Sequence, residues 1–384
     1  MKRRSFLSMS AAAGATLCVC GVSGVCSVPS MRACASVATH IEALRRPFGK
    51  LLILVELKGG NDGLNTVIPF ADPAYYRLRK NIGIKREQAI QLDARTALHP
   101  SLEPLMPLWQ NRQLAIVQGV GYARPNLSHF RSMEIWDTAS RADEYLRDGW
   151  LTRALAAALA RQGFPADGVV IGSAEMGPLA NGARAGENGT AQTVARLHPV
   201  QGESQLKTVF PASPFGESIR TAMQMLEAHT RLTRQTRAAR SRGVAAIRLT
   251  LDGFDTHYNQ PERHRLLLAQ LADGLAAMRS ALIELGRWND SLVMTYAEFG
   301  RHPRENDSYG TEHGTAAPHF LMGGRVLGGL HGLAPDFGQL DGNGNLPAGL
   351  DFRRLYATVL GPWWGLGASA IMHERLEPMP LLRV

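Results

Sequence analysis

Cysteine is nearly absent from this chain, and its few copies are confined to one end. The 384 residues contain four cysteines, Cys18, Cys20, Cys26 and Cys34, and none follows residue 34. If residues 1–38 are a removed leader, the mature protein has no thiol. Such a protein folds without disulfides even in an oxidising compartment. Any metal site must then be built from His, Asp and Glu, which excludes zinc-finger-like sites.

Acidic residues are missing from the first 38 positions, which hold four basic ones. A basic start, a moderately apolar stretch rich in Ala, Gly and Ser, and small residues at 33–35 or 36–38 are typical of a cleaved signal peptide. The segment RRSFL (3–7) resembles a twin-arginine export signal, which is an address read by a receptor. We expect residues 1–38 to be removed and the protein to be periplasmic or secreted after passage through the twin-arginine export machinery.

Charge and hydrophobic runs are modest in the rest of the chain. Removing residues 1–38 leaves 38 Lys and Arg against 33 Asp and Glu, so the net charge falls from +9 to +5. The most basic stretch, RQTRAARSR (234–242), has no interleaved aromatic residue and is typical of a solvated helix face. No nucleic-acid partner is expected. No later stretch reaches the roughly 18 apolar residues of a membrane helix, so no integral membrane segment is expected after cleavage.

Apolar strand-like runs alternate with amphipathic helical patterns between residues 39 and 384. The expected strands are 51–57, 114–120, 168–172, 244–251, 291–297 and 319–324. The expected helices are 128–139, 150–162, 217–241 and 263–286. This alternation predicts an α/β fold with a mostly parallel central sheet covered by helices on both faces. We expect residues 39–384 to form one domain with loop insertions, such as 181–193 and 335–347.

The ends of four expected strands carry side chains suited to metal binding or catalysis. The first strand runs into GGNDGLN (59–65), where two glycines precede Asp62. The other candidates are Ser128, Asp255, His257, Glu298, Arg301, Glu312, His313 and His319. Each has a simple structural explanation, such as a helix cap for Ser128 or a salt bridge for Arg301. Together, however, these residues follow strand ends, where a parallel sheet forms its binding sites. This joint placement favours a site for a divalent metal: Zn²⁺, Mn²⁺, Mg²⁺ or Ca²⁺.

Six motifs occur together in a fixed order along the chain. They are the twin arginines, GGNDGLNTVIPF, NLSHFRSMEIWDTA, GFDTH, AEFGR and GTEHG. This set closely resembles the bacterial family called domain of unknown function 1501. The family in turn resembles the alkaline phosphatase superfamily, which includes sulfatases and cofactor-independent phosphoglycerate mutases. The resemblance implies an alkaline-phosphatase-like fold.

The resemblance also implies a two-metal site. One ion would be held by Asp62, Ser128, Glu312 and His313, and the other by Asp255, His257 and His319. Ser128 would be the nucleophile and Arg301 would hold the substrate anion, while Asn61, Asn65 and Glu298 would support the ligands or contact substrate. Two departures from the superfamily pattern are the Glu-His pair at 312–313, where Asp-His is usual, and the close Asp-x-His spacing.

Three functions follow from these residues. The first is an exported metal-dependent hydrolase acting on a small phosphate or sulfate ester. The second is a metal-free serine esterase similar to the GDSL-like enzymes, suggested by GGND and the Asp255–His257 pair, but the chain has no early Gly-Asp-Ser and no Gly-x-Ser-x-Gly. The third is a non-catalytic, degenerate member that binds a metal, an anionic glycan or a partner protein.

Overall fold

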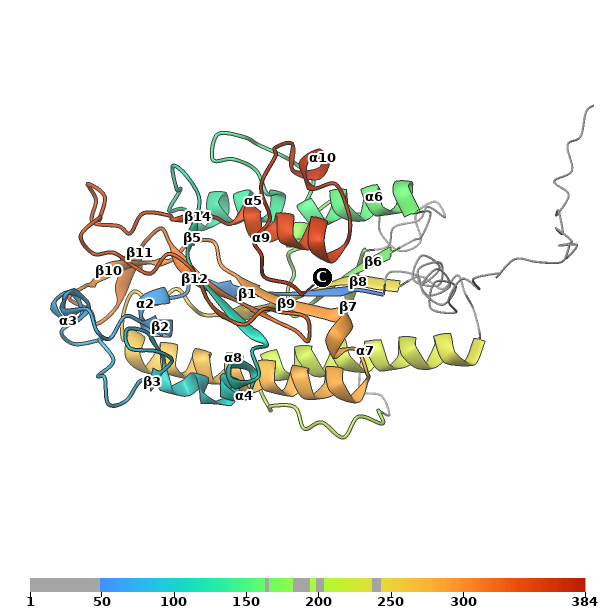
Figure 1. The fold of residues 1–384 in the computed structure, drawn as a ribbon, viewed down its shortest axis with the longest axis horizontal. Coiled ribbons are helices and arrows are strands. Elements are labelled where there is room, and N and C mark those ends of the chain that lie inside the picture. The colour runs from blue at the N-terminus through green and yellow to red at the C-terminus, as the bar shows by residue number, and fades with distance from the viewer. Residues whose placement is uncertain (1–48, 163–165, 182–193, 198–203, 237–242, 384) are drawn as a thin grey trace, which may run out of the picture. The chain divides into compact units, whose positions relative to one another are not determined.

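The computed structural model describes residues 49–162, 166–181, 194–197, 204–236 and 243–383 (Figure 1). The expected leader, residues 1–38, therefore lies outside the described residues. Most of the expected loop 181–193 and the last residues of the expected helix 217–241 also lie outside them. All statements below concern the described ranges.

A nine-stranded sheet forms the centre of the structure. Its strand order is β13-β5-β12-β9-β1-β8-β6-β7, with β14 pairing with β5. The strand bounds are β1 (Leu51–Lys58), β5 (Leu114–Gly121), β6 (Ala166–Ile171), β7 (Val194–Leu197), β8 (Gly243–Asp252), β9 (Ser291–Tyr296), β12 (Ala317–Met322), β13 (Gly329–Gly332) and β14 (Leu350–Asp351). Among these described strands the antiparallel pairs are β12 with β5 and β12 with β9, and the other pairs are parallel. The predicted mostly parallel α/β sheet is confirmed.

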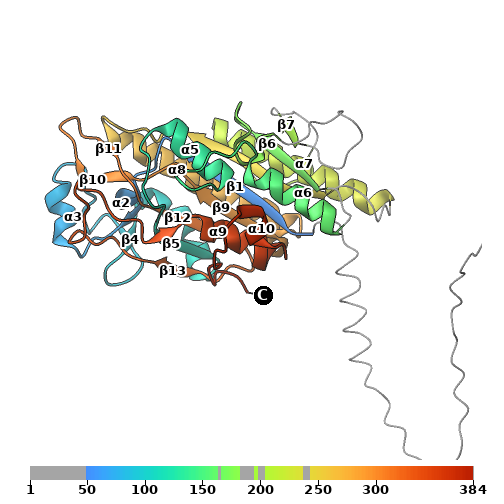
Figure 2. The same cartoon turned by 90° about the horizontal axis from the view of Figure 1, so that it is seen from above.

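Two small sheets and short helical segments flank the central sheet. The small sheets are β10 (Arg301–Glu305) with β11 (Thr311–His313), and β2 (Val67–Ile68) with β4 (Ala97–Leu98) and β3 (Ile90–Gln91). The short segments are α2 (Gly63–Thr66), α3 (Pro73–Leu78), η1 (Pro100–Leu105), α4 (Met106–Gln110), η2 (Gly177–Leu179), η3 (Trp288–Asp290), α9 (Arg353–Thr358), η4 (Val359–Trp363) and α10 (Ala368–Met372). Figure 2 shows that β10, β11 and α3 lie together at one end of the sheet.

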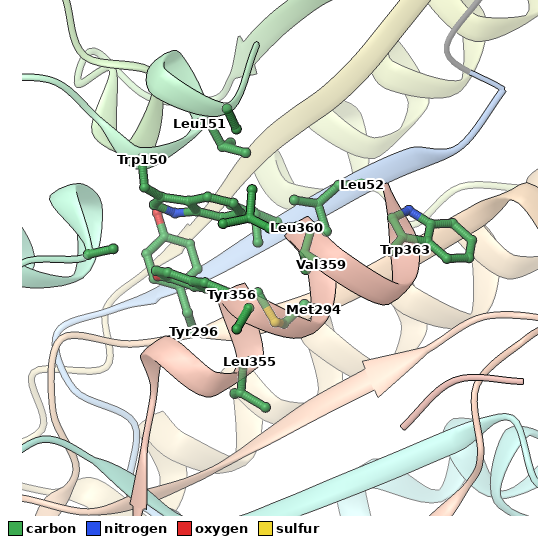
Figure 3. Close-up of a cluster of buried hydrophobic side chains, with 14 of the residues drawn as sticks. Leu52, Trp150, Leu151, Met294, Tyr296, Leu355, Tyr356, Val359, Leu360 and Trp363 are labelled. Carbon is green, nitrogen blue, oxygen red and sulfur yellow. The ribbon is translucent and has the colours of Figure 1, made fainter. Parts of the chain in front are cut away.

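One face of the sheet is covered by α5 (His129–Thr138), α6 (Trp150–Gln162) and α9 (Figure 1). Leu52 and Leu54 of β1 point to this face because successive strand side chains alternate. They join a core rich in aromatic rings, in which the Trp150 and Tyr356 rings stack with their centroids 4.3 Å apart (Figure 3). Burying each such large apolar side chain contributes about 1.5–3 kcal/mol.

The opposite face is covered by α7 (Pro214–Thr236), α8 (Gln260–Glu284), η1 and α4. The alternate residues of β1, including Leu51 and Ile53, point into this second core. By length and composition alone α8 is apolar enough to cross a membrane, with a mean hydropathy of 1.4 over 18 residues. Half of that stretch is buried against the rest of the structure, and this burial accounts for its apolar character. The prediction of helices on both faces is confirmed.

The direction of the strands determines where a site can form. Because β1, β8 and β9 are parallel and β5 is related to β9 through the antiparallel β12, these four strands end at one edge. The loop after β5 leads to the first turn of α5, and the β10–β11 hairpin follows β9. The segments that carry the candidate residues therefore meet at the carboxyl edge of the sheet.

Candidate metal centre

The two glycines after β1 allow a close approach between two loops. Gly59 has φ +113° and Gly60 has φ +80°, a region that favours glycine. A Cβ on Gly59 would lie 2.3 Å from the backbone nitrogen of Asp255, and one on Gly60 would lie 2.5 Å from the Phe299 ring. The glycines are needed because the end of β1 packs directly against the segment carrying Asp255.

Asp62 lies beside this turn, but its carboxylate bonds protein donors. The side chain is fully buried, and Oδ2 accepts a hydrogen bond from Arg79 at 2.5 Å and another from Gln260. Oδ1 caps the short helix α2 by accepting the backbone N–H of Leu64 at 3.2 Å. Burial raises the pKa of Asp62, but the adjacent Arg79 guanidinium outweighs this and lowers it. Asp62 is thus half of a buried ion pair and lies outside the cluster described next.

Asp255 is the centre of a cluster that also contains three histidines. Its Oδ1 lies 3.0 Å from Nε2 of His257, 3.2 Å from Nε2 of His313 and 3.6 Å from Nε2 of His129. Nε2 of His257 also lies 3.0 Å from Nε2 of His313. The loop after β8 contributes two of these residues, β11 contributes one, and the start of α5 contributes the fourth.

Hydrogen bonds fix which nitrogen of each histidine carries a proton. Nδ1 of His129 lies 2.8 Å from Oε1 of Glu298, and Nδ1 of His313 lies 2.8 Å from the carbonyl oxygen of Leu127. Nδ1 of His257 lies 3.2 Å from a carboxylate oxygen of Glu312. Carbonyl and carboxylate oxygens only accept hydrogen bonds, so each Nδ1 must donate. In the neutral imidazoles, all three Nε2 lone pairs then face Asp255.

This convergence fits a bound cation. Lone pairs on nitrogen and oxygen atoms about 3 Å apart repel each other unless a proton or a metal lies between them. Zinc bound tetrahedrally at about 2.0–2.1 Å to nitrogen and oxygen keeps its ligand atoms roughly 3.3 Å apart, close to the observed separations. The candidate ligand atoms of His129, Asp255 and His313 all lie within 4.8 Å of one another, the one such group of three or more among the described residues.

Arg301 links Asp255 of the cluster to the turn after β1. Its side chain is fully buried and donates to Asp255 Oδ1 at 2.6 Å, to the carbonyl of Gly60 at 2.8 Å and to the carbonyl of Gly59. Partial burial raises the pKa of Asp255, but the hydrogen bond from the Arg301 guanidinium and its charge lower it to about 2. The guanidinium is thus occupied by the protein. The role predicted for Arg301 is to hold the substrate anion; in this structure the side chain is buried and bonds Asp255 and backbone carbonyls.

Glu298 connects the cluster to the β1 turn. It is buried, and its Oε1 accepts from His129 Nδ1 at 2.8 Å and from the backbone N–H of Gly59 at 2.9 Å. The hydrogen bond to this carboxylate raises the pKa of His129. A carboxylate behind a histidine fixes the ring and makes its outward nitrogen a better metal ligand. Glu298 thus has the contacts expected of the supporting role suggested for it from the sequence.

We predict that Glu298→Gln weakens metal binding by about 10- to 100-fold without unfolding the protein. The amide oxygen can still accept from His129, but the negative charge behind the ring is lost. Competition against a chromophoric chelator measures the affinity. Glu262→Gln is the matched control, since it makes the same change at an exposed carboxylate that pairs with Arg265. Equal affinities for Glu298→Gln and wild type would contradict the supporting role.

Ser128 is the N-cap residue of α5, directly before His129. Its backbone is held by hydrogen bonds to Asn126 and from Ser132, both 2.9 Å long. The side chain is exposed and makes no capping hydrogen bond, so the simple explanation of Ser128 as a helix cap is not supported. A free hydroxyl therefore lies at a helix N-terminus, where the macrodipole favours negative charge.

Three other candidates lie away from the cluster. His319 is buried against the Trp136 ring, with centroids 5.2 Å apart, and neither ring nitrogen has a hydrogen-bond partner in the described part of the chain. Burial lowers its pKa to about 3. Asn61 bonds Thr66 and His264, and Asn65 bonds Tyr75, Arg79 and the Ile82 carbonyl. These asparagines hold the α2 region together instead of facing the cluster.

Glu312, the last of the predicted ligands, contacts the cluster through His257. One of its oxygens accepts from Asn306 at 2.8 Å and the other faces Nδ1 of His257. The hydrogen bond from Asn306 lowers the pKa of Glu312. The structure thus combines members of the two predicted ligand sets, Asp255 and His257 with His313, around one point. Asp62 and His319 do not join them.

His129 is the member of the cluster that was missed from the sequence. It stands next to Ser128 in the motif NLSHF, which drew attention only to the serine. The position of His129 could have indicated its role. It is the first residue of α5, and a helix that begins at the carboxyl edge of the sheet places its first residues near the strand ends. A histidine in that turn is therefore a candidate ligand for the same reason as the histidines that follow the other strands.

Comparison with a family model supports the resemblance seen in the motifs. Residues 216–376 match the model described as "Protein of unknown function (DUF1501)". The matched segment contains Asp255, Glu298 and His313. It begins after Ser128 and His129, so the match does not include these two residues. No curated protein matches the chain.

Several solved structures are similar at low identity. One is the lipoteichoic acid synthase LtaP from Listeria monocytogenes, at 11% identity over 86% of this chain and 78% of that one, with a TM-score of 0.37. Another is the PsFucS1 sulfatase from Pseudoalteromonas sp., at 11% identity over 92% and 75%, with a TM-score of 0.38. A third is a protein in the alkaline phosphatase superfamily from Vibrio parahaemolyticus, at 11% identity over 74% and 64%, with a TM-score of 0.35.

Proposed function

We propose that this protein is an exported, metal-dependent hydrolase of phosphate or sulfate esters. The ion is held by His129, Asp255 and His313, and Ser128 is the nucleophile. The observation that carries the proposal is the cluster itself. Imidazole lone pairs and a carboxylate converge at the carboxyl edge of the sheet, next to a free hydroxyl at a helix N-terminus.

The donor set favours a transition metal. Two imidazole nitrogens and one carboxylate oxygen suit Zn²⁺ or Mn²⁺ better than Mg²⁺ or Ca²⁺, which prefer oxygen ligands. Three protein ligands would leave an ion held here open to a substrate atom, as in catalytic zinc sites. A divalent ion held by His129, Asp255 and His313 would supply Lewis-acid chemistry to the ester and to the serine hydroxyl.

The protein's own groups perform the remaining tasks. The N-terminus of α5 presents backbone N–H groups and a partial positive charge to an anionic ester. Arg301 holds Asp255 and the β1 turn in place through buried hydrogen bonds. Glu298 orients His129, and the Leu127 carbonyl orients His313. The ligand positions are therefore preorganised before substrate arrives.

A non-catalytic metal-binding protein is the second candidate, and one observation favours it. Nε2 of His257 lies 3.0 Å from both Asp255 Oδ1 and His313 Nε2, so His257 is placed to act as a fourth ligand. Four protein ligands close a tetrahedral site, as in structural zinc centres. The metal-free esterase is disfavoured, since no serine hydroxyl bonds either nitrogen of His257 among the described residues.

The test is elemental analysis of protein purified without chelator, followed by assay of a panel of phosphate and sulfate esters. We expect bound zinc or manganese and turnover that EDTA abolishes and added metal restores. His129→Ala should lose both metal and turnover. His373→Asn, which changes an exposed histidine outside the cluster, is the matched control and should retain both.

The outcomes separate the candidates. Turnover that survives complete metal removal contradicts the proposed hydrolase. Stoichiometric metal without turnover of any ester, together with loss of metal in His257→Ala, favours the binding protein. If the protein takes up no divalent metal under any condition, both the metal-dependent hydrolase and the metal-binding protein are excluded.

A further inference from the structure

A partly open pocket of about 190 Å³ lies beside the metal cluster. It is bounded by α2 and the start of β2, by the start of β12, and by the segment 333–349. Its wall is largely apolar, with Leu64, Val67, Ala316 and Leu346 among the contributors. Arg301 belongs both to this wall and to the metal cluster, where its guanidinium is already bonded.

One buried polar side chain lines this space without a partner. Gln118 of β5 is 6% exposed, and its amide makes no hydrogen bond to any described residue. It also lines an adjoining space of about 280 Å³ that includes Thr96 and Arg95, so the two spaces meet at Gln118. The Gln118 amide is not among the fully buried polar atoms that lack a partner, so water in these spaces can bond it, and a ligand's polar group would replace that water.

We infer that this cavity binds a small neutral molecule with a ring-sized apolar body and one hydroxyl or amide group, which bonds Gln118. The volume supports the size, because an apolar cavity of about 150 Å³ accepts benzene. The lining supports the polarity: most of the wall is apolar. Of its polar side chains besides Arg301, Gln118 is buried whereas Asp336 and Gln339 are exposed, so Gln118 is placed to select the polar group. A charged ligand is disfavoured, since Arg301 already donates to Asp255 and to four backbone carbonyls around it.

The cavity is expected to work independently of the metal. Apart from Arg301, no residue of its wall belongs to the cluster of His129, Asp255, His257 and His313. Binding there should therefore be unchanged by EDTA. This independence allows the inference to succeed or fail without reference to the proposed hydrolase.

A fluorine NMR titration tests the inference on the full-length protein. The probes are 4-fluorobenzyl alcohol and 4-fluorotoluene, which lacks the hydroxyl. We expect saturable binding of both to wild type, with and without EDTA. Gln118→Met keeps the side-chain length but removes the amide, and should weaken the alcohol by about three- to tenfold while 4-fluorotoluene is unaffected.

A second variant locates the binding site. Ala316→Leu fills part of the cavity and should abolish binding of both probes, whereas Ala94→Leu at an exposed position should not. Absence of saturable binding to wild type overturns the inference, as does full binding to folded Ala316→Leu. If Ala316→Leu does not fold, the Gln118→Met comparison decides: equal loss of both probes, or loss of neither, overturns the role of the amide.

Discussion

Ser128→Ala should reduce ester turnover by at least about 10³-fold while the protein stays folded and keeps its metal. Loss of an essential nucleophile has effects of this size in other hydrolases. The serine side chain makes no capping hydrogen bond, so its removal should change the free energy of unfolding by less than about 1 kcal/mol. Turnover, metal content and urea unfolding are measured on the same preparation.

The control and the comparison with metal ligands make this result specific. Ser308→Ala removes another exposed hydroxyl, on the β10–β11 hairpin, and should leave turnover unchanged. His313→Ala should instead lose metal together with activity, so the two variants must be compared at matched metal occupancy. Undiminished turnover by Ser128→Ala would show that the attacking group is a water molecule or another side chain.

The fold could be read from the sequence because its signals are local. The runs at 51–57 and 114–120 predicted β1 and β5 to within about one residue, since unbroken apolar stretches of this length are typical of buried strands. The helical spacing at 263–286 likewise predicted α8. The short strands β13 and β14 carried no such pattern, because two to four residues are too few to show a period.

The site could be read only in part, because proximity to a strand end does not fix where a side chain points. Asp255 and His257 were found because they follow a strong strand, and both lie in the cluster. His319 lies inside β12, where the alternation of the strand turns its ring under α5 against Trp136. Most partners of Arg301, the carbonyls of Gly59, Gly60 and Phe254, lie on loops far away in the sequence, which no local pattern encodes.

Asp62 is the clearest case in which the sequence did not reveal the partner of a side chain. Its position after two glycines was interpreted as a carboxylate offered to a metal. The deciding residue is Arg79, 17 positions later, whose guanidinium bonds Asp62, Asn65 and the carbonyl of Pro303 inside the protein. Nothing in the sequence around Arg79 indicates that its side chain is buried. An arginine placed in the interior requires an anion beside it, and that requirement explains the carboxylate at position 62.

Asp62→Asn should therefore destabilise the fold strongly, by about 3–5 kcal/mol, because it leaves the buried charge of Arg79 uncompensated. Since the folded-state pKa of Asp62 lies below its ordinary value, the carboxylate's contribution is fully present above about pH 4 and is lost as the pH falls through the folded-state value. The difference in unfolding free energy between wild type and variant should be complete at pH 7 and shrink in acid. Urea unfolding at several pH values measures it.

Asp72→Asn is the matched control, because Asp72 also caps a short helix, accepting from the Ala74 N–H at 2.8 Å, but has no buried arginine beside it. Asparagine caps a helix about as well as aspartate, so this variant should keep wild-type stability. Folded Asp62→Asn should still take up metal, since the cluster of His129, Asp255 and His313 does not include Asp62. A stable Asp62→Asn protein that binds no metal would reverse the assignment: Asp62 would then be a ligand, and its ion pair with Arg79 would be dispensable.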